Sequence, residues 1–175
     1  MATLHHNISG ELTTQLLAAG DNVNVSKISL TNSQKVSKCK VDLYIEKKLV
    51  GKFYLLKGVE IPMGATLVYD SSNGVRFSNA TGEFGLYIKL TDGASFELTG
   101  DINPGNNTTT VPGTNTLFLS EVSIGDEIVV TSETRTVTAI TSDTSLTVNT
   151  TFGEDLATDT SPDCNPTAMV DVIIN

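Results

Sequence analysis

The sequence has no tryptophan, only two cysteines and two histidines, and aromatic residues make up 6% of its 175 residues. No apolar run approaches the roughly 18 residues that a membrane-spanning helix needs, so we expect no membrane partner. Cys39 and Cys164 fit no metal-binding or redox spacing, which predicts two free thiols. Charged residues form only 18% of the chain. Together these shortages argue against a coiled coil, a helical bundle and a disulfide scaffold.

Basic residues are nearly absent from the second part of the chain. Residues 1–100 contain 10 Lys and Arg against 9 Asp and Glu, whereas residues 101–175 contain Arg135 alone against 11 acidic residues. The whole chain has a formal net charge of −9. Because an acidic chain repels phosphate, we expect no nucleic-acid partner. The change of charge at residue 101 indicates two segments of different character.

Alternating apolar and polar residues dominate residues 1–100 and predict half-buried antiparallel strands. Residues 39–57 predict a β-hairpin that turns at Lys47–Lys48. Residues 10–19 are the one helix candidate, but their alternation favours a strand. The apolar face of the first hairpin strand consists of Cys39, Val41, Leu43 and Ile45.

Further strands are expected on both sides of this hairpin. Asp92–Gly93 between two alternating runs predicts a second hairpin, in which residues 84–90 pair with residues 94–100. The remaining strands are expected within residues 22–32 with a slip at Ser26–Lys27, within 59–64 up to a Pro-x-Gly turn, at 65–70 and after a turn at 72–74.

Residues 102–116 are rich in Gly, Pro, Asn and Thr and predict a linker or an irregular loop. A compact module of short strands is expected next, and an acidic loop at residues 153–166 follows it. Residues 169–174 are apolar on both faces, so we expect them inside a sheet of the first domain. The apolar pairs of the module's four strands are Leu117/Leu119, Ile128/Val130, Val137/Ile140 and Leu146/Val148.

The sequence therefore predicts an all-β protein. We expect an antiparallel β-sandwich or barrel formed by residues 1–100 plus 167–175. A small Thr-rich, acidic β-module at residues 101–166 is inserted before the last strand.

We find no catalytic, cofactor-binding or metal-binding pattern in the sequence. His5 and His6 are adjacent, and neighbouring residues rarely ligate one ion. No Gly-x-Ser-x-Gly elbow is present for a Ser/His/Asp site. The acidic loop lacks the regular ligand spacing of a calcium loop. We therefore expect a protein that is not an enzyme and has no cofactor.

Lysines concentrate in and around the first hairpin, and two interpretations of this patch are open. They can form a charged outer face that protects a sheet from edge-to-edge association. Alternatively they can dock on an acidic partner, such as the inserted module of another copy. The residues are Lys35, Lys38, Lys40, Lys47, Lys48, Lys52 and Lys57.

Several segments resemble a pattern found in small structural proteins of tailed bacteriophages. They read VDLYI at residues 41–45, FYLLKGVEIPMG at 53–64, TLV at 66–68 and VDVII at 170–174. Residues 122–152 also resemble small Thr-rich β-modules of phage virion proteins. The resemblance implies a non-enzymatic virion component with a β-sandwich or barrel body.

On this resemblance we expect a capsid decoration or cement protein first, and a neck, tail or fibre component second. Its partners would be other virion proteins of the capsid, neck or tail, and further copies in a homo-oligomer. We expect the protein to be made in the host cytoplasm, since its start lacks a secretory signal pattern, and to reside in the virion.

A rival class is a β-sandwich that binds a host glycan on an aromatic platform, and an enzyme ranks third. The candidate platform residues are Tyr44, Phe53, Tyr54, Tyr69, Phe84 and Tyr87.

Overall fold

The structure, a computed structural model, describes residues 3–73, 77–80, 84–153, 158–159 and 161–175. Every strand pair in it is antiparallel, which confirms the predicted all-β antiparallel class. No helix among the described residues is long and apolar enough to cross a membrane.

The chain divides into two compact units. Unit 1 comprises Met1–Gln34, Lys38–Asp92 and Ala168–Asn175, and unit 2 comprises Lys35–Ser37 and Gly93–Thr167. The chain thus passes from unit 1 to unit 2 after residue 92 and returns after residue 167, where the sequence analysis expected these boundaries after residues 100 and 166.

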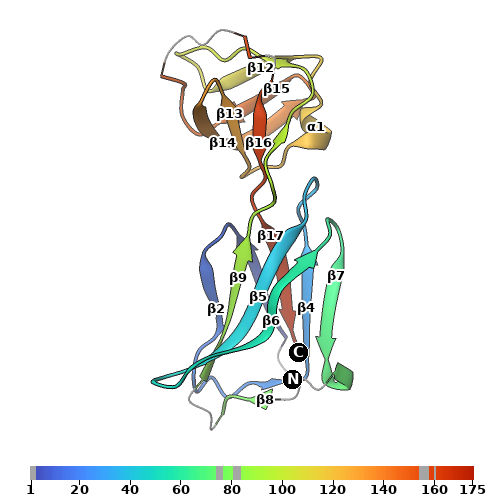
Figure 1. Cartoon of the computed structure of the whole chain (residues 1–175), viewed down its shortest axis with the longest axis vertical. Coiled ribbons are helices and arrows are strands. Elements are labelled where there is room, and N and C mark those ends of the chain that lie inside the picture. The colour runs from blue at the N-terminus through green and yellow to red at the C-terminus, as the bar shows by residue number, and fades with distance from the viewer. Residues whose placement is uncertain (1–2, 74–76, 81–83, 154–157, 160) are drawn as a thin grey trace. The chain divides into compact units, whose positions relative to one another are not determined.

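Unit 1 is a sandwich of two four-stranded sheets (Figure 1). Sheet 1 has the order β1 (Leu4–Ser9), β17 (Met169–Ile174), β4 (Lys27–Asn32) and β7 (Thr66–Asp70). Sheet 2 has the order β2 (Thr13–Leu17), β9 (Phe84–Thr91), β5 (Cys39–Lys47) and β6 (Gly51–Ile61). Two short strands, β3 (Asn24–Val25) and β8 (Phe77–Ser78), pair separately, and a 3₁₀ turn, η1, spans Ser71–Asn73.

The core of unit 1 lies between these sheets. Sheet 1 contributes Leu30 and Val172 to it, and sheet 2 contributes Leu43 and Ile88. Because successive side chains on a strand point to opposite faces, the apolar alternation of the sequence places one face of each sheet in this core. The last strand, β17, pairs with β1 on one side and β4 on the other, so it lies inside a sheet of the first unit as predicted.

Unit 2 has its own sheet and its own core. Phe118, Ile128 and Phe152 are among its fully buried side chains. One short helix, α1 (Phe118–Glu121), accompanies the sheet. The seven strands lie in the order β10 (Phe96–Glu97), β16 (Asp163–Asn165), β13 (Glu127–Val130), β14 (Glu133–Ser142), β15 (Ser145–Val148), β12 (Thr110–Thr114) and β11 (Asp101–Ile102).

The predicted hairpin at Asp92–Gly93 is wrong. Strand β9 pairs with β2 and β5 in unit 1, whereas β10 pairs with β16 in unit 2. The carboxylate of Asp92 accepts a hydrogen bond from the backbone N–H of Ala168. The dipeptide therefore marks the exit from unit 1, not a tight turn.

Three predictions for the second segment need correction. Residues 102–116 are not a linker, since they contain the buried Ile102 of β11 and all of β12, in which Val111 is buried. Leu117 and Leu119 do not form a strand but lie in and beside α1, which buries Phe118 instead. The acidic loop contains β16, and its residues 154–157 and 160 lie outside the described residues.

Three predictions for the first segment also change. The slip at Ser26–Lys27 separates two strands, β3 and β4, because Ser26 and Lys27 both donate their backbone N–H to the carbonyl of Asn175. Residues 59–61 continue β6 past a bulge at Gly58, where φ is +60°. The expected turn at 72–74 begins in η1, and residue 74 lies outside the described residues.

Candidate functional site

One residue from each strand of sheet 2 lines up in a row across the outer face of that sheet. The pairing registers connect them in the order Gln15 of β2, Tyr87 of β9, Tyr44 of β5 and Tyr54 of β6. We call these four residues the tyrosine row. The neighbours of the row along the strands, among them Leu43, belong to the core. Strand alternation therefore places the row on the opposite, outward face.

The rings of the row are in contact with one another. Tyr44 stacks on Tyr87 with centroids 5.6 Å apart, and it meets Tyr54 at 5.4 Å in a tilted arrangement. Both distances lie in the favourable range for aromatic pairs. At the end of the row, Gln15 Nε2 donates a hydrogen bond to Tyr87 Oη at 2.9 Å. Tyr44 is only 2% exposed under these neighbours, so the outer face is as closely packed here as a core.

Gly85 makes room for this stack. It lies two residues before Tyr87 on β9, on the same face of the strand. A Cβ atom at position 85 would come within 2.9 Å of Tyr87 Cε2 and 3.0 Å of the carbonyl oxygen of Leu17. The missing side chain therefore lets the Tyr87 ring lie against the strand.

Two lysines of the edge strand β6 lie over the rings. Lys52 Nζ is 4.6 Å from the centroid of Tyr44, and Lys57 Nζ is 4.9 Å from the centroid of Tyr54. Lys52 also donates a hydrogen bond to Tyr44 Oη at 3.3 Å, and this bond raises the pKa of the Lys52 ammonium. The ammonium groups of Lys52 and Lys57 therefore make cation–π contacts with the rings of the tyrosine row.

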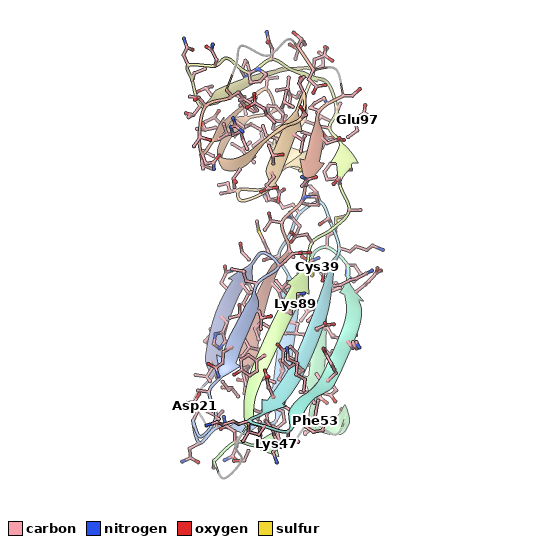
Figure 2. All side chains as sticks on the ribbon, turned by 60° about the vertical axis from the view of Figure 1, so that its left-hand side comes forward. Asp21, Cys39, Lys47, Phe53, Lys89 and Glu97 are labelled. Carbon is pink, nitrogen blue, oxygen red and sulfur yellow. The ribbon has the colours of Figure 1, made fainter. Side chains whose placement is uncertain are left out.

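The β5–β6 hairpin ends in exposed apolar side chains. We define the hairpin end as residues 47–54; Val50 N donates to Lys47 O across its turn. Leu49 is 99% exposed at the tip with φ of +63°. The other exposed apolar residues are Val50, Phe53 and Tyr54, and the exposed lysines are Lys47, Lys48 and Lys52. In Figure 2, Lys47 and Phe53 lie at one end of unit 1 and Cys39 at the other end of β5.

Unit 2 has a second group of exposed apolar residues around α1. We define the α1 face as Leu117, Leu119 and Ile124, each of which is between 44% and 59% exposed. The Asp143 carboxylate accepts the backbone N–H of Leu119, and the Glu121 carboxylate accepts two hydrogen bonds from Thr99. No Lys or Arg occurs between residues 89 and 135. The α1 face is therefore apolar with an acidic border.

The lysine patch predicted from the sequence is divided by the structure. Lys38 and Lys40 form ion pairs with Glu60, at 2.8 Å and 3.8 Å, and the hydrogen bond from Lys38 lowers the pKa of the Glu60 carboxyl. Lys35 belongs to unit 2. The lysines at the hairpin end and over the tyrosine row are the part of the patch that borders exposed apolar residues.

The six aromatic candidates for a glycan platform fall into two groups, one packed inside unit 1 and one on its outer face or hairpin end. Tyr69 packs against the core of unit 1, and Phe84 is buried in an edge-to-face contact with Phe77 at 5.6 Å. The other four candidates lie in the tyrosine row or at the hairpin end. The sequence analysis did not identify Gln15 or Gly85. It expected the hairpin turn at Lys47–Lys48, whereas the turn spans residues 48–50. The one available signal of the exposed hairpin end was the pair of apolar residues that follows the lysines, Leu49 and Val50.

His5 and His6 lie on opposite faces of β1, as strand alternation requires, so they do not share one ligand position. Among the described residues, no group of three or more His, Cys, Asp or Glu lies close enough to hold a metal ion.

Cys39 and Cys164 are buried free thiols. Burial raises the pKa of Cys39 to about 11 and also raises that of Cys164, which Asp126 raises further. Both thiols therefore stay protonated and are weak nucleophiles at neutral pH.

No protein family model matches the sequence, and no curated protein matches it. A solved structure of a serine protease of Aeromonas sobria gives a TM-score of 0.28 at 10% sequence identity. The match covers 100% of this chain and 27% of the protease chain. A likeness at this level carries no argument about the fold or the activity.

Proposed function

We propose that the chain is a non-enzymatic structural protein of a tailed-bacteriophage particle, and that it decorates or cements the capsid by docking on the particle surface. The hairpin end carries this proposal. Its exposed apolar residues form a cluster beside lysines at the end of a closely packed sheet, and such clusters mark interaction sites on protein surfaces. Segments 41–45, 53–64, 66–68 and 170–174, which resemble small phage structural proteins, lie in unit 1. Residues 122–152, which resemble Thr-rich modules of virion proteins, lie in unit 2.

In this proposal the protein is made in the host cytoplasm and resides in the virion. Its partners are capsid, neck or tail proteins and other copies of the chain, and it needs no cofactor, nucleic acid or membrane.

Copy number in purified particles tests the proposal. Quantitative mass spectrometry of the phage against its major capsid protein is expected to give a number that approaches that of the capsid protein. A few copies, in step with portal or tail proteins, would replace decoration by a neck, tail or fibre role. Absence from the particle would overturn the virion proposal.

A glycan-binding module is the second candidate, and the tyrosine row favours it. The partly exposed ring of Tyr54, the amide of Gln15 and the ammonium groups of Lys52 and Lys57 are groups that can contact a saccharide. A glycan array probed with the full chain decides between the candidates. Saturable binding that is lost in Tyr54→Ala but kept in Tyr69→Phe would favour the glycan module, whereas decoration predicts no saccharide affinity.

A further inference from the structure

The exposed apolar residues of the chain concentrate in two places with opposite charge. The hairpin end has four of them within six residues, Leu49 to Tyr54, and the α1 face has three of them within eight residues, Leu117 to Ile124. Of the other exposed apolar residues that the structure describes, Leu12 and Met63 are single, and Val68 and Ile173 are separated by Ser29 on sheet 1. Single exposed apolar residues are ordinary, but clusters mark interaction sites.

The segments that carry these two surfaces have net charges of opposite sign, and Glu121 and Asp143 are the carboxylates placed at the α1 face itself. Residues 47–58 contain four lysines and no acidic residue. Residues 93–167, which form almost all of unit 2, contain eleven acidic residues and one basic residue, Arg135. The guanidinium of Arg135 is itself bound to the carboxylate of Glu133, so it does not offset the acidic border of the α1 face. Such complementarity steers association and fixes which surfaces meet.

We propose that the hairpin end of one copy docks on the α1 face of a second copy, with the lysines of the hairpin end opposite the acidic border of that face. This inference rests on the homo-oligomer part of the proposed function and names the surfaces that form it. Two different surfaces meet in this contact, so it is heterologous, and a bound pair still offers one free hairpin end and one free α1 face. Repetition of the contact closes into a ring or extends as a filament.

The turn of the hairpin is suited to such a contact. The nine residues of β5 span about 30 Å, which places the tip at the end of unit 1 away from Asp92 and Ala168, where the chain leaves and returns. The closely packed tyrosine row supports the hairpin where it joins the sheet. Leu49 has a positive φ, a backbone conformation that asparagine adopts more readily than leucine. The conformation of the turn therefore does not explain why the residue at this position is apolar.

Sedimentation velocity on the full chain tests the contact with three variants. The hairpin variant is Lys48→Glu with Leu49→Asn, and the α1 variant is Leu119→Glu with Ile124→Asn. The control is Met63→Gln, which changes an exposed apolar residue outside both surfaces. All substituted side chains are exposed. Near-ultraviolet circular dichroism verifies the tyrosine packing of unit 1 in each variant, and hydrogen exchange of the amides in β13 and β16 verifies that unit 2 stays folded in the α1 variant.

The wild type and the control are expected to associate beyond a dimer as concentration rises. Association should weaken when salt is raised from about 0.05 M to about 0.5 M, which shortens the Debye length roughly threefold. Each double variant alone is expected to associate roughly 30-fold more weakly or worse. Mixed in equal amounts, the two variants should form a heterodimer and nothing larger, because the mixture contains one intact pairing of the two surfaces.

Three results would overturn the inference: a wild type that stays monomeric, a hairpin variant that associates like the control, or an α1 variant that still dimerises alone through two hairpin ends. None of them affects the copy number in particles, so failure of this inference and failure of the virion proposal are distinguishable.

Discussion

The carboxylate of Asp92 accepts a hydrogen bond from the backbone N–H of Ala168 at 2.6 Å, although the two residues are 76 positions apart. Asp92 is the last residue of unit 1 before the chain enters unit 2, and Ala168 is the first residue after it returns. The backbone N–H of Asp92 donates in turn to Glu11 Oε1 at 3.0 Å. The hydrogen bond between Asp92 and Ala168 holds the end of β9 in sheet 2 next to the start of β17 in sheet 1.

We expect Asp92→Ala to lower the free energy of unfolding of unit 1 by about 1–2 kcal/mol, because it removes a charge-assisted acceptor from the N–H of Ala168. All four tyrosines of the chain, at positions 44, 54, 69 and 87, belong to unit 1, and there is no tryptophan. Tyrosine fluorescence during urea unfolding therefore reports on unit 1 alone. Asp92→Asn keeps a neutral acceptor and should lower the free energy of unfolding by less than Asp92→Ala does. Equal losses in both variants would contradict the role given to this hydrogen bond.

The packing of the tyrosine row predicts that Gly85→Ala destabilises unit 1 by about 1–3 kcal/mol, since the new methyl group overlaps the Tyr87 ring and the carbonyl of Leu17. Near-ultraviolet circular dichroism should lose intensity, because the stacked rings of Tyr44 and Tyr87 must separate. Gly105→Ala is the matched control, as its Cβ would meet no atom closer than 3.4 Å. An unchanged spectrum in the Gly85 variant would show that the stack does not depend on this glycine.

Within sheet 2, the sequence analysis succeeded for strand β5, where the local apolar alternation agrees with the observed burial. The alternation of residues 39–45 reports directly which side chains enter the core, because one residue of slip would expose all of them. The same reasoning could not reveal the tyrosine row. Which residues become neighbours across β2, β9 and β5 depends on pairing between segments that are far apart in the chain, and this pairing leaves no local periodicity.

Unit 2 was harder to predict for a related reason. Strand β12 contains Pro112 and Gly113 and buries only Val111, so no alternation marks it as a strand. Leu117 and Leu119 alternate like a strand, yet the helical hydrogen bond from Val122 N to Phe118 O turns both leucines outward. Exposed apolar residues produce this kind of error, since they look like core residues in the sequence.

Burial of the Cys39 thiol predicts a loss of stability in alkaline solution. Its pKa is about 11 in the folded protein, against an ordinary value of 9.0. The unfolded chain therefore releases the thiol proton at lower pH than the folded chain, and the stabilisation by the neutral thiol, present below pH 9, is lost as pH rises towards 11.

A shift of two pKa units corresponds to at most about 3 kcal/mol. We expect the stability of the wild type to fall more steeply between pH 9 and pH 11 than that of Cys39→Ala, measured by urea unfolding with far-ultraviolet circular dichroism. All other ionisable groups are shared by the two proteins, so the difference in slope isolates the thiol. Parallel curves would show that Cys39 ionises equally in the folded and unfolded chains.

The buried carboxylate of Asp126 gives a prediction that is specific to unit 2. Asp126 is fully buried, and its two oxygens accept the backbone N–H groups of Ser123 at 2.8 Å and Thr167 at 2.9 Å. Asp126→Ala leaves both donors without this acceptor in a poorly solvated place, which costs about 3 kcal/mol. Hydrogen exchange of the most protected amides in β13 and β16 should accelerate roughly 150-fold as a result.

Amides of β5 and β9 should keep their exchange rates, because they belong to unit 1, which has a separate core. Asp126→Asn preserves one acceptor oxygen but turns an amide group towards the other backbone N–H, so its effect should lie between those of the wild type and the alanine variant. Acceleration in both units would show that they unfold together, and no acceleration in β13 would show that the turn before this strand does not need the Asp126 carboxylate. The expected result, faster exchange confined to unit 2, would follow from two β units that are joined in one chain yet stabilised by separate cores.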